Sequence, residues 1–267
     1  MALEPTSVQR DRMLAHGKNK LILTQFLDFK DPGAARDYLS KTHRIVEDEK
    51  GTRDHQLKIE QTITSGEHPY QYLLVDRFLS SKALLMAHEK AREIRLTALN
   101  SSYAILIQPN PRIPKIAKSL GFMESAFTRL LGTSEIKSFP DSSPNLNAET
   151  DPDLDKVKEF SSGDLNQAFY MVNLNQFIPG GKRTYNQYST WITPYLISVG
   201  GYPVIYGKIL GTYIGDQKDS LFNSWHDFAL VFYSSRTSFL RLMTNTPRGA
   251  AKIRRSSLMK VTLMACG

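Results

Sequence analysis

A pattern that occurs twice in the chain constrains the fold more than any other feature of the sequence. Residues 21–29 read LILTQFLDF and residues 169–177 read FYMVNLNQF, so each is an apolar run with an amide side chain fifth and a phenylalanine last. A proline and glycine turn follows each run, at residues 31–33 and 179–181. Runs of this length, bounded by such turns, predict β-strands. We therefore expect two copies of one unit.

The correspondence continues through a helix in each copy. Tyr38 and Tyr188 lie 150 residues apart, and so do Gly51 and Gly201, where each stretch of helical spacing ends. Glycine suits the position that follows a helix. We therefore expect these two glycines to terminate the two helices.

Each copy then shows a further passage from strand to helix to strand. A β-type run ends in a pair of serines, at residues 80–81 and 234–235, before another stretch of helical spacing. Serine in that place predicts a helix N-cap and not a nucleophile. Short apolar runs at residues 103–107 and 261–265 predict the last strands. The predicted order is β-α-β-β-α-β in both copies.

That order is the ferredoxin-like arrangement, in which an antiparallel sheet carries two helices on one face and leaves the other face bare. Apolar residues on both sides of the strands require a second cover. We predict an α+β fold of two tandem ferredoxin-like repeats, residues 18–109 and 167–267, which pair sheet to sheet as an intrachain dimeric α+β barrel. Residues 110–166 are predicted to hold a helix at 114–131 and an exposed, disordered acidic linker, because residues 136–167 carry a net charge of −4.

Composition sets the class of protein. Hydrophobic residues make up 41% and charged residues 22% of the 267 residues, which is typical of a folded globular chain. The single cysteine, Cys266, excludes an internal disulfide. No stretch approaches the roughly 18 consecutive apolar residues of a membrane helix. We expect a cytoplasmic protein without a membrane partner.

The net charge of +8 is unevenly distributed along the chain. After Asp227 there is no acidic residue, whereas seven basic residues follow it: Arg236, Arg241, Arg248, Lys252, Arg254, Arg255 and Lys260. Such a stretch suits an acidic partner, including a nucleic acid. The RNA-recognition consensus is absent, so we do not expect a nucleic-acid partner.

The second copy carries motifs of a known family. These are MVNLNQF at residues 171–177, YGKILGTYIGD at 206–216, YSSR at 233–236 and the stretch 254–258. Residues 168–266 thereby resemble a family of uncharacterised bacterial domains in the dimeric α+β barrel superfamily. The resemblance implies the ferredoxin-like barrel. The wider superfamily includes cofactor-free monooxygenases, lactone isomerases, haem-degrading enzymes and haem peroxidases, which use the cavity between paired sheets.

Two amides of the second copy are candidate ligand-binding residues. Asn173 and Asn175 alternate with Val172 and Leu174, so both amides are expected to project towards the cavity between the sheets. Asn173 would hold a ligand carbonyl or hydroxyl there, or else form a cross-strand amide bond that ties the repeats together.

Aromatic and basic residues complete the candidate site. Tyr188 and Trp191 belong to an aromatic helix face, which is more typical of core packing, although Tyr188 is best suited to present its hydroxyl to a cavity. Tyr206 opens the YGKILGTYIGD motif and joins the candidates. Arg254, at the position of the arginine in the resembled family, suits a carboxylate, or else belongs to a solvated basic face. A loop position is favoured for His226 over a general acid–base role.

The sequence favours a protein that binds a small molecule between its sheets. Cofactor-independent isomerisation or oxygenation of a carbonyl- or carboxylate-bearing substrate is the chemistry that such a cavity suits. No metal or cofactor is expected, since the histidines show no ligand spacing and none stands in a matched motif for haem. The alternative is a non-catalytic interaction or scaffold module with a basic C-terminal surface, and charge reversal of Arg241, Arg248 and Lys252 separates the two. We expect a monomer with an internal pseudo-dimer or a homodimer.

Overall fold

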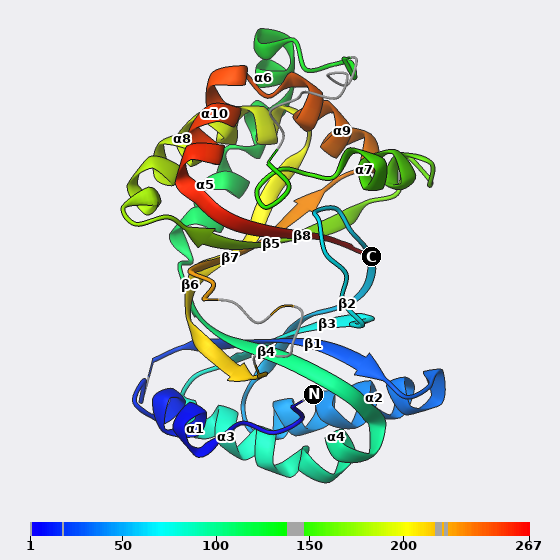
Figure 1. Ribbon diagram of the computed structural model, residues 1–267, viewed down its shortest axis with the longest axis vertical. Coiled ribbons are helices and arrows are strands. Elements are labelled where there is room, and N and C mark those ends of the chain that lie inside the picture. The colour runs from blue at the N-terminus through cyan, green and yellow to red at the C-terminus, as the bar shows by residue number, and fades with distance from the viewer. Residues whose placement is uncertain (1, 18, 138–146, 217–220, 222–223) are drawn as a thin grey trace. The chain divides into compact units, whose positions relative to one another are not determined.

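The computed structural model describes residues 2–17, 19–137, 147–216, 221 and 224–267 (Figure 1). Helices and antiparallel strands alternate along the chain, which confirms the α+β class. The chain divides into two compact units. Unit 1 comprises Met1–Ile59, Glu67–Pro109 and Gly207–Ser224, and unit 2 comprises Glu60–Gly66, Asn110–Tyr206 and Trp225–Gly267. Gly207–Ser224, within the second predicted repeat, belong to unit 1, and Glu60–Gly66, within the first, belong to unit 2.

Unit 1 is built on an antiparallel sheet with helices on one face (Figure 1). Its elements are α1 (Ser7–Leu14), β1 (Leu21–Phe29), α2 (Pro32–Asp48), β2 (Thr52–Thr62), β3 (Tyr72–Phe78), α3 (Ser81–Lys90), α4 (Arg92–Ala98) and β4 (Leu99–Pro109), with the second part of β6 (Gly201–Ile214). Strand β1 pairs with β3 and β4, β3 also pairs with β2, and β4 also pairs with β6. Leu21 and Leu23 of β1 pack with Leu84 and Ala87 of α3, so alternate residues of β1 face the helices.

Unit 2 has the same layered construction. Its elements are α5 (Arg112–Ser119), the 3-10 helix η1 (Gly121–Met123), α6 (Glu124–Leu131), α7 (Leu154–Ser161), β5 (Phe169–Phe177), α8 (Gly181–Ser198), the first part of β6, β7 (Asp227–Tyr233), α9 (Arg236–Asn245), α10 (Arg248–Ser257) and β8 (Leu258–Cys266). Strand β5 pairs antiparallel with β7 and β8. Its apolar core lies between this sheet and α7, α8 and α9.

Local signals placed several elements correctly. Strands β1 and β5 begin and end at the predicted residues. The hydroxyl of Ser80 accepts a hydrogen bond from the Ala83 amide at 3.2 Å, and that of Ser235 accepts one from the Ser238 amide at 3.0 Å. Both serines therefore cap helices, as predicted.

The helix ends use different residues from those predicted. The left-handed conformation falls on Lys50 and Gly200, with φ of 57° and 76°, and not on the glycines that follow them. Close packing explains instead why glycine occupies positions 51 and 201. A Cβ at Gly51 would lie 2.9 Å from the Phe78 ring, and one at Gly201 would lie 2.5 Å from a neighbouring leucine methyl.

The predicted disordered linker is wrong over part of its length. Its residues 138–146 lie outside the described residues, but α7 lies within it and buries Val157 and Phe160. The Phe160 ring packs against Phe169 with centroids 5.0 Å apart. The acidic residues of α7 form only its outer face, so composition concealed an amphipathic helix. The helical region predicted at 114–131 is confirmed by α5, η1 and α6.

Candidate functional site

The sheet of unit 2 places its polar side chains on the face that the helices cover. Phe169 and Phe177 of β5 pack in the apolar cluster with Tyr185 of α8. Side chains alternate along a strand, so Asn173 and Asn175 point to this same face. The predicted direction is therefore wrong, because the two amides lie between β5 and the helices and not towards a facing sheet.

The two amides differ in their partners. Asn173 donates from Nδ2 to the backbone oxygen of Met171 at 3.1 Å. Asn175 is buried and donates from Nδ2 to the Tyr185 hydroxyl at 3.4 Å. Burial raises the pKa of Tyr185, so this phenol stays protonated at neutral pH. Asn175 is thereby connected to α8, whereas Asn173 donates to an acceptor within its own strand.

A close approach of two helices positions the first turn of α8. A Cβ at Gly181 would lie 2.2 Å from the backbone oxygen of Ser257 at the end of α10, so a larger residue does not fit. Lys182 follows directly, in the first turn of α8. The helix dipole disfavours a positive charge there. The ammonium therefore needs negative or polar partners from outside the helix.

Tyr206 of β6 and Asp227 of β7 supply those partners. Lys182 forms an ion pair with Asp227 and donates from Nζ to the Tyr206 hydroxyl at 2.6 Å. The Tyr206 hydroxyl donates to Asp227 Oδ2 at 2.5 Å. Nζ also lies 5.0 Å from the centroid of the Phe177 ring and 5.2 Å from that of Tyr206. We call Lys182, Tyr206 and Asp227 the lysine cluster.

The members of the lysine cluster differ in access to solvent. The Asp227 side chain is 6% exposed, whereas that of Lys182 is 44% exposed. Burial raises the pKa of Tyr206 above its ordinary value, and the adjacent Asp227 carboxylate raises it further. Tyr206 therefore remains a hydrogen-bond donor at neutral pH. Lys182 is the member that can donate to an oxygen atom arriving from solvent.

The positive charge of Arg254 acts on three tyrosines of unit 2. Burial raises the pKa of Tyr185, Tyr188 and Tyr233, and the positive charge of Arg254 lowers each pKa in part. The guanidinium also lies 3.7 Å from an Asp151 carboxylate oxygen. Asp151 therefore partly neutralises the charge of Arg254.

Three of the predicted site residues lie along α8 and the sheet: Asn175 donates to Tyr185, Tyr188 packs against Tyr185, and Tyr206 bonds to Lys182. Arg254, on α10, pairs with Asp151. Trp191, in contrast, is 55% exposed. Its ring lies close to Gly249 of α10, since a Cβ built at that glycine would be 3.7 Å from the ring. His226 is exposed, and its Nδ1 accepts a hydrogen bond from the Phe177 amide at 2.9 Å. That bond gives His226 a structural role at the end of β5.

Sequence reasoning missed Lys182 and Asp227 as members of a site. A lysine in the first turn of a helix is an unfavourable choice and is the one local signal for Lys182. Asp227 reaches Lys182 because β7 pairs beside β5, with Asn175 opposite Asp227, and spacing along the chain does not reveal that register.

The basic C-terminal stretch is largely paired. Arg236 lies 2.7 Å from a carboxylate oxygen of Glu60, Arg254 and Arg255 both pair with Asp151, and Lys260 lies 3.7 Å from Glu149. Within the described part of the chain, Arg241, Arg248 and Lys252 form no ion pair. Three unpaired basic side chains would attract an acidic partner more weakly than the seven basic residues counted in the sequence.

The described residues contain neither a metal-binding cluster nor a helix that could cross a membrane. In this part of the chain, no group of three or more histidine, cysteine, aspartate or glutamate side chains is placed to hold a metal ion. None of the helices over these residues combines the length and the apolar character needed to cross a membrane.

Comparison with known proteins gives structural matches only. No family model matches the chain, and no curated protein matches it. A protein of unknown function from Rhodopseudomonas palustris is 22% identical over 44% of this chain and 94% of that chain, with a TM-score of 0.39. A mutant chlorite dismutase from Candidatus Nitrospira defluvii is 6% identical over 97% of this chain and 95% of that chain, with a TM-score of 0.45. An anthrone oxidase-like protein is 9% identical over 95% of this chain and 93% of that chain, with a TM-score of 0.44.

At TM-scores below 0.5, these likenesses say nothing about activity.

Proposed function

We propose that this protein binds a small molecule with a carbonyl or carboxylate group at the helix-covered face of unit 2. The observation that supports the proposal most is the position of Lys182. The Lys182 side chain is 44% exposed, yet a buried carboxylate and two aromatic rings fix where its ammonium lies. A donor that is held in place before the ligand arrives is what recognition of an oxygen atom requires.

The side chains around Lys182 indicate what the ligand looks like. The Lys182 and Asp227 charges cancel, so a neutral carbonyl or a single carboxylate suits the site better than a multiply charged anion. The Phe177 ring lies under the ammonium and stacks against His226 with an interplanar angle of 5°. A flat, partly apolar ligand therefore matches this end of the sheet. Tyr206 and Asp227 act as positioning residues for Lys182.

A reaction at this site would use the same donor. In cofactor-independent isomerisation, Lys182 would stabilise negative charge that develops on the carbonyl oxygen of the substrate. The raised pKa of Tyr206 disfavours its phenolate, so Tyr206 would keep its proton and would not act as the base. The remaining predicted residues, Asn175, Tyr188 and Arg254, would contact the rest of the ligand.

We further propose that the fold consists of two ferredoxin-like repeats that pair sheet to sheet. The order of elements supports this, because β1, α2, β2, β3, α3 and β4 are matched by β5, α8, β6, β7, α9 and β8. The capping serines, Ser80 and Ser235, stand at the same place in the two series.

Replacement of Lys182 tests the proposed function. We expect Lys182→Met, which keeps the aliphatic stem, to weaken binding of benzoate and acetophenone at least tenfold, about 1.4 kcal/mol, by removing the open donor. Titrations followed by saturation-transfer NMR measure both affinities. Lys158→Met is the matched control, because Lys158 also pairs with an aspartate, Asp155, at 3.1 Å but lies on α7.

The two variants separate the outcomes. Weaker binding in Lys182→Met with unchanged binding in Lys158→Met supports the site. Equal affinities in the wild type and Lys182→Met, or no binding of either probe at millimolar concentration, would refute it.

A further inference from the structure

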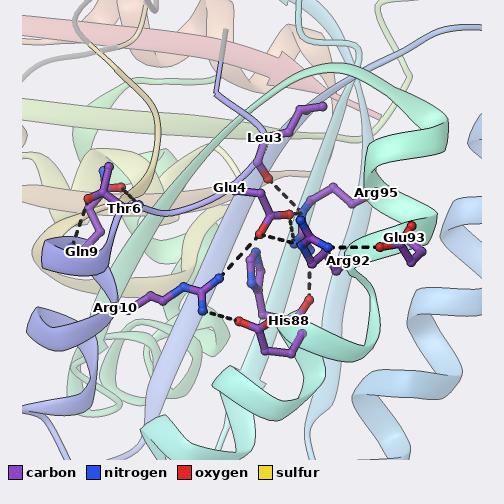
Figure 2. A network of polar contacts seen from close by, with 10 residues as sticks. Leu3, Glu4, Thr6, Gln9, Arg10, His88, Arg92, Glu93 and Arg95 are labelled. Carbon is purple, nitrogen blue, oxygen red and sulfur yellow. Dashed lines mark hydrogen bonds and ion pairs between the residues drawn. The ribbon is translucent and has the colours of Figure 1, made fainter.

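An extended segment at the N-terminus delivers a carboxylate to a buried arginine of unit 1. The segment ends at Thr6, which accepts from the Gln9 amide at 3.3 Å while its own amide donates to Gln9 Oε1 at 2.7 Å, so α1 begins at Ser7. We call residues 2–5 the N-terminal arm. Figure 2 shows Glu4 of the arm between Arg10 and Arg95.

Arg95 of α4 is buried for its whole length, with 1% exposure. Its Nε donates to the Leu3 oxygen at 2.9 Å and to Glu4 Oε1 at 3.1 Å, its Nη2 pairs with Glu4 Oε1, and its Nη1 donates to the His88 oxygen at 3.1 Å. A buried guanidinium requires an anion. In this structure the N-terminal arm provides it.

The same place attracts a carboxylate through two further arginines. Glu4 Oε2 accepts no hydrogen bond from the described residues, yet it lies 3.8 Å from Arg10 Nη2 and 3.9 Å from Arg92 Nε. Arg10 also pairs with Glu89 at 2.8 Å. Arg92 pairs with Glu93 at 3.1 Å (Figure 2). One oxygen of Glu4 is thus held tightly while the other is held only by charge.

A small cavity adjoins Arg95. It has a volume of about 20 Å³, and its lining includes Arg95, His88 and Gln25. This is enough for about one water molecule. His88 is 4% exposed, and neither of its ring nitrogens has a hydrogen-bond partner among the described residues. The Tyr213 ring meets His88 edge-on at 4.9 Å, and the Tyr213 hydroxyl likewise has no partner in the described part of the chain.

Unpartnered buried polar atoms are costly. His88 lines the cavity and Tyr213 packs against His88, so this part of unit 1 suits a polar ligand. We propose that Arg95, His88 and Tyr213 form a second binding site, in unit 1, for a small monocarboxylate, and that Glu4 occupies it as a tethered competitor. A free carboxylate would pair with Arg95 in place of Glu4 and offer its second oxygen to His88. The N-terminal arm would leave, while α1 would stay anchored by the buried Met13.

Acetate is the probe for this site, with sodium chloride as the control for ionic strength. We expect Glu4→Gln to bind acetate at least tenfold more tightly than the wild type, because the tethered competitor loses its charge. The readouts are the imidazole signals of His88 and the guanidinium Nε–H signal of Arg95 in nitrogen-labelled protein. Glu93→Gln is the matched control, since Glu93 pairs with Arg92 but not with Arg95. It should bind acetate as the wild type does.

The wild type provides a second measurement that needs no variant. Acetate should move the backbone amide signals of Leu3 and Glu4 towards random-coil positions, and chloride should not. Acetate-specific movement of these signals supports displacement of the arm. The second site is excluded if acetate and chloride have the same effect on the Leu3 and Glu4 signals of the wild type. If Glu4→Gln folds, the two salts must also have the same effect on its His88 and Arg95 signals for the site to be excluded. Lys182 belongs to unit 2, so the outcome is independent of the benzoate experiment.

Discussion

At matched positions the two copies treat polar side chains differently. Gln25 of β1, the counterpart of Asn173, donates to Asp76 Oδ2 at 3.2 Å, and Arg53 Nε donates to Asp76 Oδ1 at 2.8 Å. Burial raises the pKa of Asp76, and the Arg53 charge opposes that rise. Unit 1 thus satisfies this carboxylate internally. Unit 2 has its own pair of oppositely charged groups at a different place, Lys182 of α8 and Asp227 of β7, and the Lys182 side chain of this pair is 44% exposed.

His88 makes the stability of unit 1 depend on pH. Burial lowers the pKa of His88 well below 6.5, and the positive charges of Arg95 and Arg10 lower it further, so the folded state holds the neutral imidazole. Below pH 6.5 the unfolded chain binds a proton that the folded chain does not bind. The stability contributed by His88 is therefore complete above pH 6.5 and is lost as the pH falls towards the pKa of the folded state.

The corresponding prediction compares two histidine variants. Between pH 6.5 and the pKa of folded His88, the free energy of unfolding should fall by about 1.4 kcal/mol per pH unit more in the wild type than in His88→Gln. Urea denaturation at several pH values measures this difference. His43→Gln, which removes an exposed histidine of α2, should follow the wild type. Parallel curves for the wild type and His88→Gln would show that His88 does not titrate in this way.

At the scale of elements, local patterns predict what local interactions determine. The apolar runs of β1 and β5 and the capping serines of α3 and α9 are each set by neighbours in sequence, and the sequence reveals them. Helix α7 was missed because acidic composition was weighed above the spacing of Val157 and Phe160, which lie three residues apart on one helix face.

The packing of α7 predicts a large cost for loss of one ring. Phe160→Ala should lower the free energy of unfolding by about 3–5 kcal/mol, because Phe160 is 1% exposed and meets the rings of Phe169 and Phe239. Lys158→Ala, on the exposed face of the same helix, should change it by less than about 0.5 kcal/mol. Chemical denaturation measures both values. A cost below about 1 kcal/mol for Phe160→Ala would contradict the placement of α7 in the core.

At the scale of the whole molecule, the sequence predicts the order of helices and strands but not which residues of distant elements lie side by side. Asn175 and Tyr206 were recognised as candidates, whereas Asp227 entered the site only through its register opposite Asn175. The side to which Asn175 points depends on which face of the sheet the helices cover, and alternation alone cannot decide that. The free charge at the C-terminal end was overestimated for the same reason, since Arg236 meets Glu60 from a distant part of the sequence.

Mass spectrometry of freshly purified protein under native and denaturing conditions tests the central claim most directly. After incubation with the small-molecule fraction of a cell extract, the wild type and Lys158→Met should carry a non-covalent added mass that denaturation removes. Fragmentation should identify a compound with a carbonyl or carboxylate group. Lys182→Met should lose most of this mass. A bare mass for the wild type, or the same added mass retained in full by Lys182→Met, would contradict the proposal that Lys182 holds a small molecule.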